Sequence, residues 1–161
     1  MVKGIDAAVF REVCGRFATG VAVVTTLDEA GNPAGMTANS FTSVSLLPPL
    51  ISVSVDHRAD MHRRILRAPT FAVNILEQRQ EALSRRFADD HPDRFAGVGH
   101  HPGETGLPLL DGTIASLECE RFADHEAGDH TIILGLVVSA AVGAGRPLLY
   151  YRGGYWDPEQ A

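Results

Sequence analysis

Two long strand-forming segments joined by a short polar turn most constrain what this chain can fold into. They cover residues 113–123 and 131–142, and residues 125–129 between them include Gly128-Asp129. Such segments favour extended backbone, and a Gly-Asp turn favours a tight antiparallel connection. The sequence therefore predicts a long β-hairpin in the C-terminal half.

Shorter strand-like segments precede and follow this hairpin. They share β-branched or alternating apolar residues, and cover residues 21–26, 34–44, 50–55, 71–76 and 148–151. Helical spacing is confined to residues 6–17, with Asp6 as N-cap, residues 60–67, and residues 77–88 with Ala82, Leu83 and Phe87 facing inward. Residues 89–106 are typical of a loop. Many hairpin-connected strands with few helices predict a mainly β, antiparallel barrel, because a closed sheet leaves no exposed edges.

Length and charge exclude several classes of protein. The 161 residues fit one domain, residues 1–161, and the formal charge of −6 argues against a broad nucleic-acid-binding face. No apolar run reaches the roughly 20 residues of a membrane span, and the N-terminus lacks a signal-peptide pattern. Cys14 and Cys119 are far apart in the sequence, without a Cys-x-x-Cys motif. We therefore expect a cytoplasmic protein with neither a membrane nor a nucleic-acid partner.

Common catalytic and metal motifs are absent from the sequence. It contains no Gly-x-Gly-x-x-Gly after a strand, no phosphate loop ending in Gly-Lys-Ser/Thr, and no Gly-x-Ser-x-Gly elbow. His100, His101 and Glu104 lie close in sequence, but neighbouring residues of an extended segment point apart. We therefore expect a polar loop there and no metal site.

Four polar strings remain, at residues 35–43, 52–58, 83–87 and 127–132. In the first, small residues would let a flat ligand lie close to the backbone, although a solvent-facing strand or a β-bulge explains the string equally well. The second is a strand that runs into a charged turn. The third fits a solvated helix face, on which at most one of Arg85 and Arg86 would face an anion. The fourth is an ordinary Gly-Asp turn, which leaves His130 unexplained.

Together and in this order, the strings resemble the short-chain flavin reductases, the reductase components of two-component flavin-dependent monooxygenases. The resemblance covers about residues 10–155 and includes residues 17–25, 48–50, 71–74 and 149–151. It implies a Greek-key, FMN-binding split β-barrel with a few flanking helices, and a homodimer. It also implies hydride transfer from NADH or NADPH to FMN or FAD, with a partner oxygenase receiving the reduced flavin.

The resemblance also implies the residues that hold the flavin. In the family, a Thr-Ala-Asn-Ser string cradles the isoalloxazine, and here that string is Thr37, Ala38, Asn39 and Ser40. The strand ending at Ser54 and Asp56 would follow the ribityl chain. The residues implied near the flavin phosphate are Ser84, Arg86 and Phe87. Residues 56–61 lack the hydroxyl groups with which relatives hold phosphate, so FMN and FAD both remain open.

The nicotinamide nucleotide is assigned by resemblance to Gly128, Asp129 and His130. We expect Asp129 to shape the turn and His130 to meet the nucleotide. No catalytic side chain is expected, because the flavin itself accepts the hydride. Two alternatives stay open: a flavin-retaining oxidase or oxygenase on the same barrel, and a non-catalytic flavin-binding protein.

A homodimer is also indicated by apolar surface. Residues 21–24 and 132–138 offer more hydrophobic surface than a small barrel interior needs. We therefore expect these strands to contribute to the dimer contact.

Overall fold

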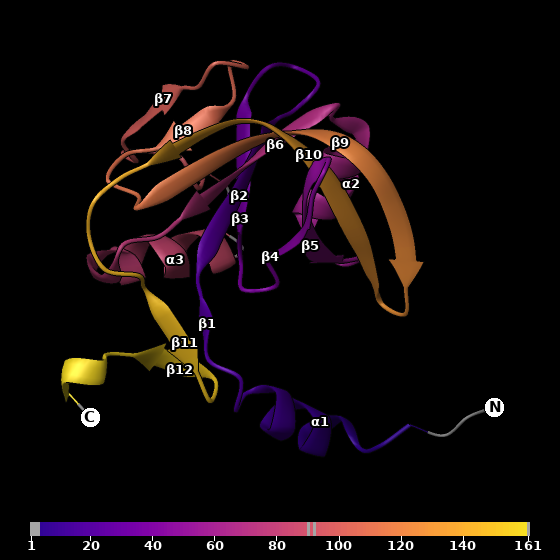
Figure 1. Ribbon diagram of the computed structural model, residues 1–161, viewed down its shortest axis with the longest axis vertical. Helices are drawn as coiled ribbons and strands as arrows, with labels where there is room; N and C mark the ends of the chain where they lie inside the picture. Colours follow the sequence, from indigo (N-terminus) through magenta and orange to yellow (C-terminus); the bar gives the residue numbers. More distant parts are fainter. Residues whose placement is uncertain (1–3, 90, 92, 161) are drawn as a thin grey trace.

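A seven-stranded antiparallel sheet forms the body of the computed structural model, which describes residues 4–89, 91 and 93–160 (Figure 1). The strand order is β3-β2-β6-β9-β10-β5-β4. The bounds of these strands are β2 Ala22–Leu27, β3 Pro33–Ala38, β4 Thr42–Leu46, β5 Pro49–Asp56, β6 Thr70–Ile75, β9 Ala115–Ala127 and β10 His130–Val142. The predicted mainly β, antiparallel fold is confirmed.

Smaller elements flank this sheet. β1 (Thr19–Gly20), β11 (Leu149–Tyr151) and β12 (Gly154–Trp156) form a three-stranded sheet, and β7 (His100–Pro102) pairs with β8 (Pro108–Leu110). The α-helices are α1 (Ala7–Cys14), α2 (Asp60–Arg67) and α3 (Glu81–Ala88), and short 3₁₀ turns cover Gln78–Gln80 and Pro158–Gln160. No helix of the described residues is long and apolar enough to cross a membrane.

Strand β2 is buried on both faces and so separates two apolar clusters. Val24 packs with Val53 and Phe71 on one side, whereas Val23 packs with Phe87 on the other. Neighbouring strand residues point to opposite faces, so a strand covered on both sides must be apolar throughout. This explains the continuous apolar run that predicted the strand.

The long hairpin is present, but its strands reach further than expected. β9 continues to Ala127 and β10 begins at His130, so the turn itself consists of Gly128 and Asp129. Gly128 has a φ of +67°, a conformation that glycine adopts without the steric cost that a Cβ brings.

Three sequence-based element predictions are corrected. The single strand expected at residues 34–44 is two strands, β3 and β4, because the chain turns between Ala38 and Thr42. Residues 89–106 contain β7, which pairs with β8. The helix at residues 77–88 begins as a 3₁₀ turn and buries Ser84 with Phe87, whereas Ala82 is exposed.

Helix α1 departs most from a core element. Asp6 is its N-cap, as predicted, and Asp6 Oδ1 accepts from Ala8 N at 2.8 Å. All of its residues are described and none is buried; Val9, Phe10 and Val13 are 51%, 57% and 63% exposed. Figure 1 shows α1 beyond β1, away from the large sheet.

The expectation that residues 21–24 offer apolar surface to a dimer contact is also corrected. Those residues are 0–3% exposed, because they form part of the two apolar clusters inside this chain. Of residues 132–138, Val138 is 44% exposed and Ile133 is buried. Other exposed apolar side chains lie on α1 and around the β4–β5 turn, where Leu46 and Leu47 are 82% and 90% exposed, and at Phe17 and Val142, which are 78% and 91% exposed.

Candidate functional site

The predicted isoalloxazine string, residues 37–40, ties two elements together. Thr37 Oγ1 donates to the carbonyl oxygen of Ser84 at 2.6 Å, which joins β3 to α3. Ser40 Oγ accepts from Ser54 N at 3.0 Å and donates to Ser54 O at 3.1 Å, which joins the turn after β3 to β5. The structure therefore brings the string, Ser54 and Ser84 into direct hydrogen-bonded contact.

The remaining members of the string differ in exposure. Ala38 is buried in the core, with 7% of its surface exposed. Asn39 follows it in the turn and is exposed, so its amide is available as donor and acceptor. A small residue beside an exposed amide is an arrangement that can accept the face and the heteroatoms of a flat ring.

The α3 residues are held firmly in the fold. Ser84 is 0% exposed, and its hydroxyl lies 2.7 Å from the Tyr155 hydroxyl. Phe87 is 1% exposed and packs edge-on against Phe95 with ring centroids 5.0 Å apart. Gly35 permits this packing, because a Cβ there would lie 2.9 Å from Phe87 Cε1. Phe87 thus anchors α3 in the core, as predicted.

Arg86 is already engaged by backbone oxygens. Its Nε donates to Arg94 O at 2.7 Å, and its Nη2 donates to Asp93 O at 3.0 Å and Ala96 O at 2.6 Å. Arg86 therefore clamps the segment after α3, a role that the sequence did not reveal. Arg85 instead pairs with Glu81 at 2.7 Å and lies over the Tyr155 ring.

Asp56, at the end of β5, belongs to a charged turn. Its Oδ1 accepts from Arg58 Nε at 3.2 Å and from Arg58 N at 2.8 Å, and its Oδ2 accepts from Arg58 Nη2 at 2.9 Å. The side-chain hydrogen bonds from Arg58, followed by the backbone one, hold the pKa of Asp56 well below its usual range. Asp56 is thus an ionised carboxylate at neutral pH.

The motif predicted to meet the nicotinamide nucleotide lies directly beside this turn. His130 is paired with Asp56 across β10 and β5, and Asp129 O accepts from His57 N at 3.0 Å. His130 Nδ1 lies 2.7 Å from Asp129 Oδ1. Since a carboxylate only accepts, Nδ1 carries the proton, and this hydrogen bond also lowers the pKa of Asp129. The motif residues are thereby oriented by one another and by the β5 turn.

The two groups of site residues lie at different ends of the sheet. Figure 1 shows the β9–β10 turn well away from α3, with β4 and β5 between them. Asp56 and His130 share one end, whereas Thr37, Ser84 and Arg86 share the other. Ser40 and Ser54 connect the two.

A cavity of about 580 Å³ lies next to this site rather than on it. It is bordered by β3, α2 and the segment after α3, and its lining includes Gly35, Arg64 and Arg94. Among the described residues, none of the predicted flavin-binding side chains lines this cavity. The platform defined by residues 37–40 thus lies outside this cavity.

Sequence reasoning missed several neighbours of the site. Tyr155 contacts Ser84, which is 71 residues away in the sequence, and His62 contacts Thr131, which is 69 residues away. No local spacing in the sequence signals either contact. The discounted metal candidates have separate partners: His100 Nδ1 lies 2.9 Å from Val98 O, and His101 Nδ1 lies 2.8 Å from Asp111 Oδ1.

The candidate site consists of small-residue strings on a β-sheet and an oriented histidine, and these residues include no activated nucleophile. Such a site is typical of a protein that binds a flat cofactor and leaves the chemistry to that cofactor. A family model described as a flavin reductase like domain matches residues 14–158, and the chain belongs to this family. It is therefore an oxidoreductase, and the resemblance recognised from the sequence is confirmed.

Known proteins support this assignment over nearly the whole chain. An NADH-dependent FAD reductase of Streptomyces globisporus is 47% identical over 159 residues, covering 96% of this chain and 86% of the relative. The reductase subunit of a flavin-dependent monooxygenase of Mycobacterium tuberculosis (strain ATCC 25618 / H37Rv) is 37% identical over 165 residues, covering 99% and 88%. A solved NADH:FAD oxidoreductase of S. globisporus C-1027, in complex with NAD and FAD fragments, matches with a TM-score of 0.90 and 44% identity, covering 100% of this chain and 99% of that one.

Proposed function

We propose that this protein transfers a hydride from NADH or NADPH to FMN or FAD and supplies the reduced flavin to a partner monooxygenase. The observation that carries the proposal is the Ser40–Ser54 contact, which joins the platform of residues 37–40 to β5. The end of β5 is in turn paired with His130. One continuous path therefore runs from the expected flavin ring site to the expected nicotinamide motif.

The bound flavin would supply the hydride-accepting chemistry, so the protein has to bind and orient its two ligands. The exposed Asn39 amide offers hydrogen bonds to the heteroatoms of a ring, beside the small, buried Ala38. Thr37 and Ser40 fix the string against α3 and β5, so its backbone does not have to reorganise when the ligand binds.

His130 is positioned to receive the nicotinamide nucleotide. Asp129 holds its Nδ1, which leaves Nε2 as the acceptor of the neutral ring. Gly128 keeps the turn free of a side chain where the nucleotide would approach. The role of His130 is contact and orientation, because hydride transfer to a flavin needs no acid or base from the protein.

A homodimer completes the site in this proposal. The exposed apolar side chains of α1, and separately those of Leu46 and Leu47, are surfaces that a second copy would cover. In this proposal the second copy also encloses part of the platform at residues 37–40. Light scattering tests this: a mass near 17.3 kDa at micromolar concentration contradicts the dimer.

The cytoplasm, which holds the reduced nicotinamide pool, is the compartment that suits this reaction. Cys14 and Cys119 are free thiols, as expected in a reducing compartment.

The function is tested by mixing the chain with NADH or NADPH and a molar excess of FMN or FAD in air. The proposal predicts many turnovers of nucleotide per chain, with a rate that saturates in free flavin. A retained-flavin enzyme would turn over without added flavin. Flavin binding without turnover would identify a storage protein, and either result would overturn the proposal.

A further inference from the structure

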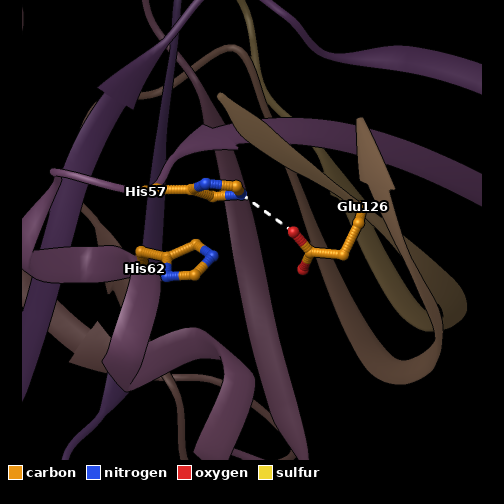
Figure 2. Close-up of side chains that lie close together, drawn as sticks. All are labelled: His57, His62 and Glu126. Carbon is orange, nitrogen blue, oxygen red and sulfur yellow. Dashed lines mark ion pairs between the residues drawn. The ribbon is translucent and has the colours of Figure 1, made fainter. Parts of the chain in front are cut away.

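A cluster of two histidines and a glutamate lies at the edge of the site, outside the residues assigned above. Figure 2 shows His57, His62 and Glu126 pointing toward one another. His57 follows β5, His62 lies in the first turn of α2, and Glu126 is near the end of β9. Their nitrogen and oxygen ligand atoms all lie within 4.8 Å of one another.

We propose that His57, His62 and Glu126 bind a divalent late first-row transition-metal ion such as zinc. Two imidazoles and one carboxylate form a nitrogen-rich ligand set that suits zinc and its neighbours better than magnesium or calcium, which prefer oxygen ligands. Three protein ligands leave a fourth position for water or an anionic ligand.

The spacing of the ligand atoms fits such an ion after small side-chain movements. His57 Nε2 and Glu126 Oε2 are 3.1 Å apart. The edge of a tetrahedron around zinc is about 3.3 Å for bonds of about 2.0–2.1 Å. The Glu126 side chain is 72% exposed, so rotation can bring its carboxylate to the remaining distance from His62.

A buried hydroxyl lies against the same three groups. Thr131 is 0% exposed, and its Oγ1 lies 2.8 Å from His62 Nε2 and 3.2 Å from His57 Nε2. It donates to Glu126 Oε1 at 3.0 Å. These contacts bring the three ligand groups together on one side of Thr131. They use the same Nε2 atoms that would bind an ion, so on metal binding each imidazole would release Thr131 and carry its proton on Nδ1.

The site would add a link between α2 and the β9–β10 hairpin, which His62 and Thr131 already join. An ion held by His62 and Glu126 would tie α2 to the β9–β10 hairpin that carries His130. Sequence spacing alone did not predict this site: His57 and His62 have a His-x4-His spacing that occurs among zinc ligands, but Glu126 is 64 or more positions away and no cysteine pair accompanies the histidines. Binding of the ion should raise the thermal unfolding midpoint, because it favours the folded state.

The alternative is an ordinary hydrogen-bond network among Thr131, the two imidazoles and the carboxylate. One Thr hydroxyl can donate once and accept twice, so neutral histidines would satisfy this network without an ion. Direct titration with a metal separates the two interpretations.

The test is isothermal titration calorimetry with zinc chloride on the full chain after chelator treatment. The proposal predicts one zinc ion per chain, and binding at least about tenfold weaker in both His62→Ala and Glu126→Gln. His125→Ala is the matched control, because this exposed histidine precedes Glu126 on β9 but points to the opposite face of the strand. Its zinc affinity should equal that of the unaltered chain.

A second readout is the visible absorption of cobalt(II), which reports a low-symmetry site with nitrogen and oxygen ligands. The band should form in the unaltered chain and in His125→Ala, and disappear in Glu126→Gln. Circular dichroism confirms that each variant is folded, and Glu126→Gln changes an exposed side chain. Absence of one-to-one binding, or an equal loss in His125→Ala, would overturn the proposal. Neither titration contains flavin or nucleotide, so the outcome is independent of the proposed reductase activity.

Discussion

The two ends of the candidate site are built differently. At the α3 end, defined by Thr37, Ser84, Arg86 and Phe87, the last residue is 1% exposed and Ser84 is 0% exposed. At the hairpin end, defined by Asp56, Asp129 and His130, the side chains of Asp129 and His130 are 81% and 41% exposed. The first end is packed and neutral where it is buried, and the second is open and charged.

This difference indicates how the flavin and the nucleotide would each bind. Partly buried hydrogen bonds at the α3 end keep the proposed flavin platform in one geometry, which would reduce the ordering cost of binding. An exposed turn at the hairpin end suits a ligand that enters and leaves at every turnover. Flavin affinity and most of the stability should therefore depend on the first end, and nucleotide use on Asp129 and His130 at the second.

The largest effect is expected from Phe87→Ala. Removing a buried aromatic ring that contacts Phe95 should lower the free energy of unfolding by about 3–5 kcal/mol. Urea denaturation measures this change. Phe122→Ala is the control, because Phe122 is 55% exposed, and its effect should stay below about 1 kcal/mol. Equal losses in the two variants would contradict a packed α3 end.

Arg86→Ala should weaken FMN binding about tenfold or more, because a charge-assisted donor contributes about 1.5–3 kcal/mol. The structure adds a second expectation: loss of three hydrogen bonds to backbone oxygens should loosen the segment after α3. Comparing FMN with riboflavin separates the two roles. If Arg86 contacts the flavin phosphate, riboflavin affinity is barely changed. Equal losses for both ligands, or a larger loss in Arg85→Ala, would limit Arg86 to its clamping role.

His130→Ala tests the hairpin end. Its kcat/KM for NADH should fall by the amount that one lost contact causes, about 1–3 kcal/mol. Steady-state kinetics at saturating flavin measure the change, and His125→Ala should behave like the unaltered chain. An unchanged kcat/KM in His130→Ala would remove this histidine from the nucleotide site.

Asp56→Asn should have the smallest effect, and one that depends on pH. The folded-state pKa of Asp56 is lowered by Arg58, so its stabilising contribution is present above the unfolded pKa, about 3.9, and is lost as pH falls below it. Thermal unfolding should therefore show a small deficit of the variant at pH 6 that disappears in strong acid. A deficit of constant size across this range would show that the charge of Asp56 does not cause it.

Much of the fold follows from local sequence patterns. The Gly128-Asp129 turn, the apolar run of β2 and the N-cap at Asp6 are each determined by neighbouring residues, and each was predicted. The break between β3 and β4 was not, because residues 34–44 carry no Pro or charge to interrupt the strand pattern. The exposure of α1 was also missed. An apolar helical face predicts that the helix is covered, but it does not distinguish packing against the same chain from packing against another chain.

The candidate site was predicted less completely, because its contacts span long stretches of sequence. The residues implied by the family resemblance do meet in part, as Ser40 with Ser54 and Thr37 with Ser84 show. The clamping role of Arg86 depends on a segment whose backbone carbonyls carry no sequence signal. The hydroxyl pair of Ser84 and Tyr155 likewise depends on how the small sheet of β1, β11 and β12 lies against α3.

The comparison between the two ends is tested most directly by measuring FMN and NADH binding separately in Arg86→Ala and His130→Ala. Equilibrium titration of FMN and of NADH into each folded variant gives four dissociation constants to compare with the unaltered chain. The account predicts a crossed pattern: Arg86→Ala loses FMN affinity and keeps NADH affinity, whereas His130→Ala loses NADH affinity and keeps FMN affinity. A collapse of FMN affinity in His130→Ala with normal NADH binding would place His130 in the flavin site and contradict the division of the site into two ends.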